Sequence, residues 1–258
     1  MSHSPLSLQF DPEWRTTLLT LCLLPILVFL GFWQLQRADD KAALAQTWEQ
    51  RRHQAPTQIG DAVGWQADTL AYMPVRLSGH FDANHYYLLD NRVYGGKFGY
   101  EVISVFTVDD QDLTVLVNRG WIAGDPARLQ QPEVSTPLGP VDISGHVYVA
   151  PGKPYLLAEQ TIKPEWPKTL QAVEMDKLTD SLTSLTGFPV FLYPVRIDAG
   201  LPGALSVDWQ LINTSPAKHT GYAVQWFTMA VVLAIFYILR SSNMLQLLTT
   251  RRRNSTEQ

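Results

Sequence analysis

The sequence contains a single cysteine and few charged residues for its length. A single cysteine excludes a scaffold held by internal disulfides. Because Cys22 lies within an apolar run, it does not indicate whether the protein is in a reducing or an oxidising compartment. Charged residues make up 17% of the chain, against about a quarter in typical soluble domains. The net charge of −4 lacks the basic excess that bulk nucleic-acid binding requires, so we expect no nucleic-acid partner.

Aromatic residues are abundant, and the apolar residues are concentrated in two long runs. The 8 Trp, 10 Tyr and 10 Phe exclude a disordered chain, because such a chain can bury a core. Thr16 to Leu35 and Gly221 to Leu239 contain no Asp, Glu, Lys or Arg. A helix of about 20 residues covers roughly 30 Å, the thickness of the hydrocarbon core of a membrane. Both runs therefore predict transmembrane helices.

Two other interpretations of these runs are weaker. A cleaved secretory signal is disfavoured for the first run, because only Arg15 supplies a basic residue before it and bulky residues follow Gly31. A buried core helix is disfavoured for the second run by its length and lack of charge. We expect both helices to remain in the protein.

Two spans place both chain ends on the same side of the membrane, and the arginines at 251–253 favour the cytoplasm for that side. The expected segments are a cytoplasmic N-terminus at 1–15, a first transmembrane helix at 16–35, an extracytoplasmic domain at 36–215, a second transmembrane helix at 216–240 and a cytoplasmic basic tail at 241–258.

The central domain has the pattern of a mostly β structure. Residues 36–52 lack Gly and Pro and predict a helical extension of the first span, and residues 174–185 predict one short helix. Alternating apolar and polar residues, bounded by turn formers, predict short strands within residues 73–77, 85–93, 100–108, 113–122, 141–149, 190–197 and 205–212. The expected fold class is an α+β membrane protein, with two transmembrane helices bracketing a mostly antiparallel, barrel- or sandwich-like domain.

A short internal echo joins two of these segments. Residues 75–80 read VRLSGH and residues 141–146 read VDISGH. Six residues do not decide between two equivalent strands and coincidence.

The chain contains no strong catalytic motif: it has no G-x-S-x-G, no H-E-x-x-H, no Walker loop and no paired CxxC. Ser78, His80 and Asp82 are close in sequence, but alternate strand residues share a face without forming a hydrolytic triad. We expect no enzymatic role for them.

Arg119 and Trp121 flank Gly120 at the end of an apolar segment and could anchor a partner through ion pairing and stacking. The alternative is a structural arginine stacked on an aromatic ring at a strand end. The cluster Asp90-Asn91-Arg92 has the same ambiguity.

The start of the second span holds the most informative polar residue. Ser215 and Pro216 are a favourable N-cap and first helical residue, which places His219 in the first turn. The positive end of the helix dipole favours the neutral imidazole, which can ligate iron.

Aromatic and amide side chains share this level of the two spans. Tyr222 and Trp226 follow His219 at i+3 and i+7, and Trp33 and Gln34 close the first span at the same depth. A planar hydrophobic cofactor such as haem could sit between the helices here. The alternative is an ordinary interfacial belt of Trp and Tyr.

Three motifs resemble the surfeit locus 1 family of cytochrome oxidase assembly proteins. They are GFWQLQRADDK at 31–41, VNRGWI at 117–122 and HTGYAVQWF at 219–227. They occur in the family's order and cover nearly all of the chain, with a weaker likeness between about Gln130 and Ser206.

The resemblance implies a non-enzymatic role in building haem-copper oxidase, in which the protein helps haem a reach the catalytic subunit. It implies that His219 ligates the haem iron. Because of their positions on the two spans, Tyr222, Trp226, Trp33 and Gln34 are expected around the cofactor, and we expect the haem binding to be transient. Arg119, Trp121 and Arg37 are then expected to contact partners, which are the oxidase catalytic subunit, haem a synthase and membrane lipid. The residues before Thr16 do not resemble a mitochondrial presequence, so we expect a bacterial inner membrane with the domain in the periplasm.

Two other functions compete with this one. The first is a cofactor-free, membrane-anchored scaffold that docks on oxidase subunits. The second is a periplasmic enzyme whose Ser, His and Asp side chains would have to converge in a concave pocket.

Overall fold

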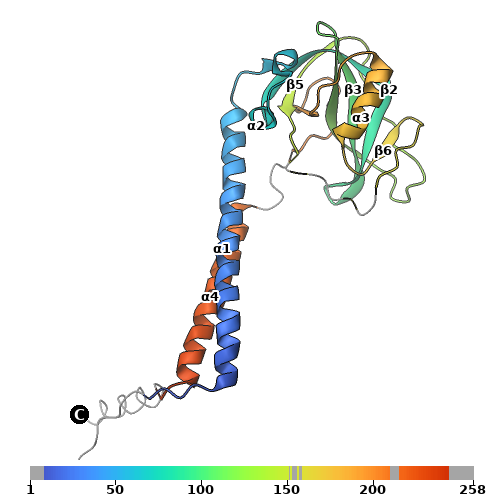
Figure 1. Cartoon of the computed structure of the whole chain (residues 1–258). Helices are drawn as coiled ribbons and strands as arrows, with labels where there is room; N and C mark the ends of the chain where they lie inside the picture. Colours follow the sequence, from blue (N-terminus) through green and yellow to red (C-terminus); the bar gives the residue numbers. More distant parts are fainter. Residues whose placement is uncertain (1–8, 151, 153–155, 157–158, 210–214, 244–258) are drawn as a thin grey trace, which may run out of the picture. The chain divides into compact units, whose positions relative to one another are not determined.

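The computed structural model describes residues 9–150, 152, 156, 159–209 and 215–243 (Figure 1). Its helices are α1 (Trp14–Arg51), the 3-10 helix η1 (Ile59–Ala62), α2 (Ala67–Leu70), α3 (Met175–Thr186) and α4 (Pro216–Arg240). Its strands are β1 (Thr57–Gln58), β2 (Pro74–Tyr94), β3 (Lys97–Val108), β4 (Leu113–Ala123), β5 (Val141–Val147), β6 (Lys168–Leu170) and β7 (Val195–Ile197). The chain forms two compact units: a helical unit (Met1–Gln46 with Leu211–Gln258) and a β unit (Thr47–Gln210).

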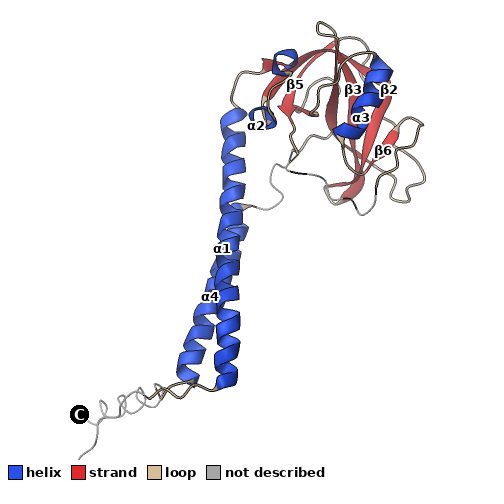
Figure 2. Cartoon of the chain, viewed as in Figure 1, coloured by secondary structure: helices blue, strands red, loops and turns tan. Residues whose placement is uncertain are grey.

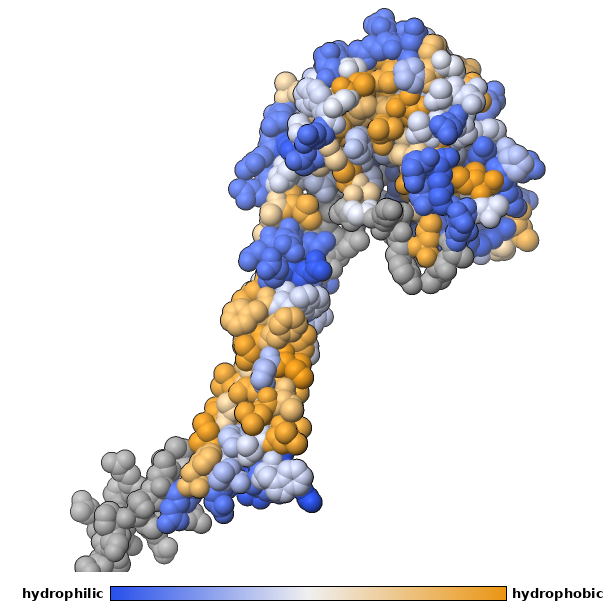
Figure 3. Space-filling model, viewed as in Figure 1, coloured by the Kyte–Doolittle hydropathy of each residue, from blue (hydrophilic) through white to orange (hydrophobic). Residues whose placement is uncertain are grey.

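The helical unit consists mainly of α1 and α4, which are both long and apolar enough to cross a membrane. Most of their apolar side chains are exposed, whereas the core helix of a soluble protein would bury them. Figure 3 shows these side chains as an apolar band with hydrophilic residues beyond it. The two expected apolar helices are present, and α1 continues to Arg51 as the residues after Leu35 predict. The basic residues at 251–253 lie outside the described residues.

The β unit contains one sheet whose strand pairing closes on itself. Antiparallel pairs join β2 to β3 and β3 to β4, β4 pairs in parallel with β7, and β7 and β5 lead antiparallel back to β2. Strands β1 and β6 add short parallel pairs along β2. Figure 2 shows the strands curving around the interior of the unit. The prediction of a mainly antiparallel sheet bracketed by two apolar helices is confirmed, with three parallel pairs added.

Strand β2 joins two segments that the sequence predicts as separate strands. Its pairing with β3 shifts register between Phe81 and Tyr86. The Asp82 carboxylate accepts hydrogen bonds from the backbone N–H groups of Asn84 and His85, at 2.8 and 3.1 Å, and so fixes the irregular stretch. The polar residues here mark a bulge rather than a loop, because ladder pairing resumes beyond them.

Two other strand predictions are wrong in part. Of residues 190–197, only β7 is a strand, and Val190 forms an isolated bridge to Thr114. Of residues 205–212, the described part makes a single bridge, from Ser206 to Trp121, while residues 210–212 lie outside the described residues. Ladder pairing is therefore limited to β7 in the first segment, and the described part of the second segment contacts the sheet at one bridge.

Apolar side chains fill both sides of the sheet. The interior holds Val75, Leu77, Phe106 and Val117, all fully buried. A second cluster lies on the other face, where Leu178 and Leu182 of α3 pack with residues that include Tyr87, Leu116 and Leu170. Helix α3 matches the helix predicted at 174–185 within one residue at each end, and it ends at Gly187, which has a φ of 78°.

The two copies of the internal echo pair with each other. Leu77 lies opposite Ile143, and the register places Val75 opposite Gly145 and Gly79 opposite Val141. The first residue of each copy therefore lies opposite the fifth residue of the other, and the third residues lie opposite each other, which gives the pair a local two-fold symmetry. The two segments are equivalent strands, the first of the two alternatives that the sequence leaves open.

Candidate functional site

Helices α1 and α4 pack closely through small residues. Gly31, Ala223 and Ala230 are buried in the helical unit. A Cβ atom on Gly31 would lie 2.6 Å from the ring of Phe227, so the ring would have to shift to admit a larger residue here. Small residues at a crossing allow backbones to come close, which is how helices pack in lipid.

The ends of the two helices away from His219 are fastened together. Arg240 forms an ion pair with Glu13 at 3.3 Å, and the hydroxyl groups of Thr17 and Tyr237 are 3.1 Å apart. The backbone N–H of Asp11 donates to the carbonyl oxygen of Ser241 at 2.8 Å. These contacts fix how α1 and α4 align along their length.

Helix α4 begins where the sequence predicts. Ser215 occupies the N-cap with extended backbone (φ −65°, ψ 147°) and Pro216 opens the helix. The Ser215 side chain makes no capping hydrogen bond, so its position favours the helix start without the hydroxyl contact that a serine N-cap commonly supplies. His219 lies in the first turn, as expected.

His219 and Gln34 are in direct contact across the helix pair. The distance between Nδ1 of His219 and Oε1 of Gln34 is 2.8 Å. Because an amide oxygen can only accept, Nδ1 carries the proton and the lone pair of the neutral ring is on Nε2. No other hydrogen bond to the His219 ring occurs within the described residues. An imidazole oriented through one nitrogen, with the other available, is the usual arrangement of a metal-ligating histidine.

The predicted aromatic neighbours of His219 are not gathered around it. Tyr222 is 50% exposed and Trp33 is 44% exposed, while Trp226 is partly buried. Among the described residues, no ring contact joins these three to one another or to His219. Arg37 lies over the Trp33 ring, 5.8 Å from its centre, and forms an exposed ion pair with Asp40.

The two helices are in direct contact at this level. The hydrogen bond between His219 and Gln34 and the close approach of Gly31 to Phe227 both join α1 to α4. A planar cofactor between the spans stays a prediction. The exposed rings of Tyr222 and Trp33 offer apolar surface on the outside of the pair.

Arg119 is buried in the β unit with 1% of its surface exposed. Its guanidinium donates to the carbonyl oxygens of Gly203 at 2.6 Å and Ser135 at 2.5 Å, and to the hydroxyl of Thr136 at 2.9 Å. It also lies over the Phe81 ring, and burial lowers its pKa to about 10. These contacts favour the structural alternative for Arg119, and partner binding stays a prediction.

Trp121 and the cluster around Asp90 occupy the neighbouring strand ends. The indole N–H of Trp121 donates to the carbonyl oxygen of Arg92 at 3.2 Å. Arg128 donates to Asp90 at 2.9 Å and to Asn91 at 2.7 Å. The contacts of both groups are internal, and a docking role for Trp121 likewise stays a prediction.

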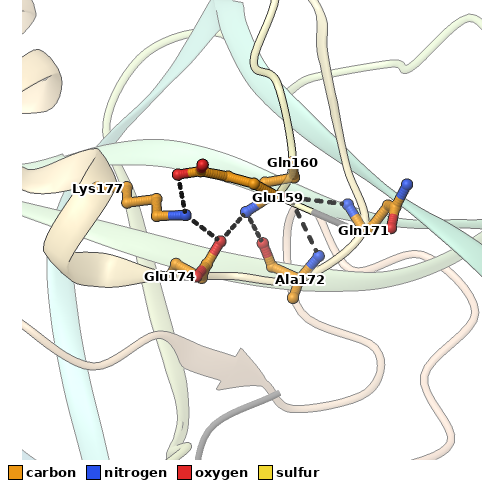
Figure 4. Close-up of polar contacts among 6 residues, drawn as sticks. All are labelled: Glu159, Gln160, Gln171, Ala172, Glu174 and Lys177. Carbon is orange, nitrogen blue, oxygen red and sulfur yellow. Dashed lines mark hydrogen bonds and ion pairs between the residues drawn. The ribbon is translucent and has the colours of Figure 1, made fainter. Parts of the chain in front are cut away.

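The polar cluster in Figure 4 joins the segment before β6 to the start of α3. The Gln160 side chain accepts from the backbone of Gln171 and donates to the carbonyl of Ala172 and to Glu174, at 3.1, 2.9 and 2.6 Å. Lys177 forms ion pairs with Glu159 and Glu174. Because these polar groups form hydrogen bonds and ion pairs with one another, the cluster has the features of a structural contact that holds the two segments together.

The three residues considered for hydrolytic chemistry have different partners. Ser78 donates to Asp142, the His80 ring contacts Asp109 at 2.8 Å, and Asp82 contacts His85. No relay joins Ser78, His80 and Asp82. Within the described residues, no group of three His, Cys, Asp or Glu side chains could hold a metal ion.

One polar site was missed by the sequence reasoning. The side chain of Arg196 in β7 lies over the rings of Tyr148 and Trp209 and makes no hydrogen bond within the described residues. The only signal in the sequence is a single arginine between two apolar residues of a short strand, and nothing in that pattern identifies the rings.

Comparison with known proteins gives a consistent result. A family model described as the SURF1 family matches residues 21–231. Surfeit locus protein 1 of Mus musculus is 23% identical, covering 84% of this chain and 73% of its own. The same protein of Xenopus tropicalis is 29% identical, covering 80% and 70%. A SURF1-like protein of Rickettsia felis is 24% identical, covering 90% of this chain and 99% of its own.

Proposed function

The chain belongs to the SURF1 family, and from this membership we propose that it is an assembly factor for haem-copper cytochrome c oxidase. Its role is to help haem a enter the catalytic subunit, and it performs no catalysis itself. The partners are that subunit, haem a synthase and the membrane lipid around α1 and α4.

The proposed location is a bacterial inner membrane, with the β unit in the periplasm and both chain ends in the cytoplasm. The two apolar helices support membrane anchoring, and the match to a Rickettsia protein supports a bacterial origin. The arginines near the C-terminus support the orientation.

The observation that carries haem binding is the hydrogen bond from His219 to Gln34. It fixes the ring through Nδ1 and leaves Nε2 as the only nitrogen that could ligate iron. The residues fit an axial ligand, while the apolar surface for the porphyrin comes from the exposed rings of Tyr222 and Trp33. Haem would supply the iron centre, and this chain would orient its ligand.

The test is the haem content of the full chain purified in mild detergent from cells that produce haem a. We expect His219→Ala to abolish the haem absorption bands. Gln34→Leu should retain them with about 10- to 100-fold weaker binding, because the orienting partner is lost. His53→Ala is the matched control, since His53 is an exposed histidine near the end of α1.

Equal haem spectra of wild type and His219→Ala, with unchanged elution and circular dichroism, would contradict the ligand assignment. Restored oxidase assembly by haem-free protein would favour the alternative function, a cofactor-free scaffold. The direct contact of α1 with α4 is the observation that supports that alternative. Normal haem a incorporation in membranes lacking this protein would overturn both.

A further inference from the structure

Strand β7 presents one arginine on the outer face of the sheet. Val195 and Ile197 are fully buried in the interior. Because side chains alternate along a strand, Arg196 points to the opposite face. It lies between Asn118 of β4 and His146 of β5 in the pairing register.

Two aromatic rings hold the guanidinium of Arg196. Its central carbon is 3.7 Å from the centre of the Tyr148 ring and 5.0 Å from that of Trp209. Both rings are fixed by the backbone of neighbouring segments. The Trp209 indole donates to the carbonyl of Ile197 at 2.8 Å, and the backbone N–H of Tyr148 donates to Pro194 at 2.8 Å. The cation is therefore positioned before any ligand arrives.

The hydrogen-bonding groups of Arg196 are unused. Its Nε is fully buried and has no partner among the described residues, and no hydrogen bond or ion pair from its other nitrogens occurs there. Burial also lowers the pKa of this side chain. A desolvated cation without a partner is costly, so such a group in a native fold calls for an explanation.

The nearby acidic groups are committed elsewhere. The Asp198 carboxylate accepts from Ser144 at 2.6 Å and lies 3.1 Å from Nδ1 of His146. The Glu101 carboxylate accepts from Asn118 at 2.6 Å and lies 3.6 Å from Arg92. Neither pairs with Arg196, although Glu101 contributes negative potential around it.

The His146 ring lies beside Asp198, and its Nε2 has no partner within the described residues. Both of its nitrogens are buried and lack a hydrogen bond of good geometry within the described residues. The Trp48 ring packs 4.7 Å from it, centre to centre. Polar nitrogens and aromatic faces thus occur together on this part of the sheet.

We propose that Arg196, held by Tyr148 and Trp209, is a binding site for a carboxylate attached to an apolar or aromatic group. The planar guanidinium matches a carboxylate, and the rings would cover the apolar part of the ligand. A singly charged carboxylate is favoured over a phosphate, because Glu101 repels a second negative charge. The carboxylate comes either from a small amphiphilic molecule or from an acidic side chain of a protein partner. The site does not depend on haem binding at His219.

The probe for the site is 4-fluorobenzoate, followed by fluorine NMR with the full chain in detergent. We expect line broadening on binding with wild type and none with the neutral 4-fluorobenzamide. Arg196→Met should weaken binding by about tenfold or more, because the charge-assisted contacts are lost. Arg196→Lys should weaken it less, since charge remains without the planar fork.

Arg128→Met is the matched control. Arg128 also lies over a ring, 4.4 Å from the centre of Phe98, but its nitrogens are already bonded to Asp90 and Asn91. Binding should be unchanged in this variant. Equal binding by folded Arg196→Met, or equal competition by inorganic phosphate, would overturn the proposal.

A second measurement needs no variant and guards against misfolding of Arg196→Met. Photolysis with 4-azidobenzoate should label peptides containing Tyr148, Arg196 or Trp209, and labelling confined to other peptides would overturn the proposal. Competition separates the two sources of the carboxylate. A protein partner is supported if acetyl-Glu-Phe-Glu-amide displaces the probe and the peptide with glutamine in place of glutamate does not. A small amphiphile is supported if neither peptide displaces the bound probe.

Discussion

Replacement of Arg119 by methionine removes the hydrogen-bond donor that holds two loops of the β unit against strand β4. In the wild type, this side chain bonds to Ser135, Thr136 and Gly203. Breaking a buried charged network costs about 3–5 kcal/mol, because the remaining groups lose their partner. In a unit of roughly 160 residues, about 1 kcal/mol shifts the melting midpoint by about 2–4 °C. We expect Arg119→Met to lower the Tm by roughly 6–20 °C.

The assay is thermal unfolding of the full chain in detergent, followed by near-ultraviolet circular dichroism and tryptophan fluorescence. Arg119→Lys should give an intermediate loss, because one ammonium group cannot replace the planar donors. Arg76→Met is the control, since Arg76 is exposed and a surface change should stay within about 0.5 kcal/mol. A stable Arg119→Met variant that fails to restore oxidase assembly would refute the structural role and favour partner binding.

Two further predictions concern the β unit. Burial raises the pKa of Tyr87 to about 12, above an unfolded value of about 10, so its stabilising contribution is complete below pH 10 and is lost as the pH rises through 12. Urea titrations should show a loss of stability across this window that is smaller by up to about 2 kcal/mol in Tyr87→Phe, where the loss that remains comes from tyrosines such as Tyr72, Tyr86 and Tyr100, whose pKa burial also raises. An equal loss in the variant would contradict the assignment. Gly79→Ala and Gly145→Ala should each destabilise the unit by more than about 2 kcal/mol, because a Cβ atom would lie 1.9 Å from the carbonyl oxygen of Thr107 and 2.3 Å from that of Arg196. Proteolysis in urea measures this loss, and wild-type resistance in both variants would show that the strands can shift.

The local patterns in the sequence predict those features that depend on neighbouring residues. The apolar runs predict α1 and α4, and the Ser215-Pro216 pair predicts the helix start. Gly95 and Gly96, both with positive φ, form the turn between β2 and β3 at a predicted boundary.

Features that depend on distant segments were not predictable from the same patterns. Strands β1 and β6 are two and three residues long and gain their structure only by pairing with β2. The hydrogen bond of Gln34 to His219 joins residues 185 positions apart, and no local rule selects that partner. The sequence predicts both residues at one depth but does not predict that their side chains contact each other.

The closed strand pairing has a consequence for biosynthesis. Strands β2, β3 and β4 leave the ribosome in order and can pair as neighbours, but β7, which lies between β4 and β5, ends at Ile197. Until that residue is translated, β4 and β5 each have an open edge, because β7 is the strand that joins them. Open edges favour aggregation. Because α1 precedes the β unit in the chain, an α1 that inserts as it emerges would hold the growing domain at the bilayer before β7 is made. Such early anchoring would keep the unpaired intermediates apart.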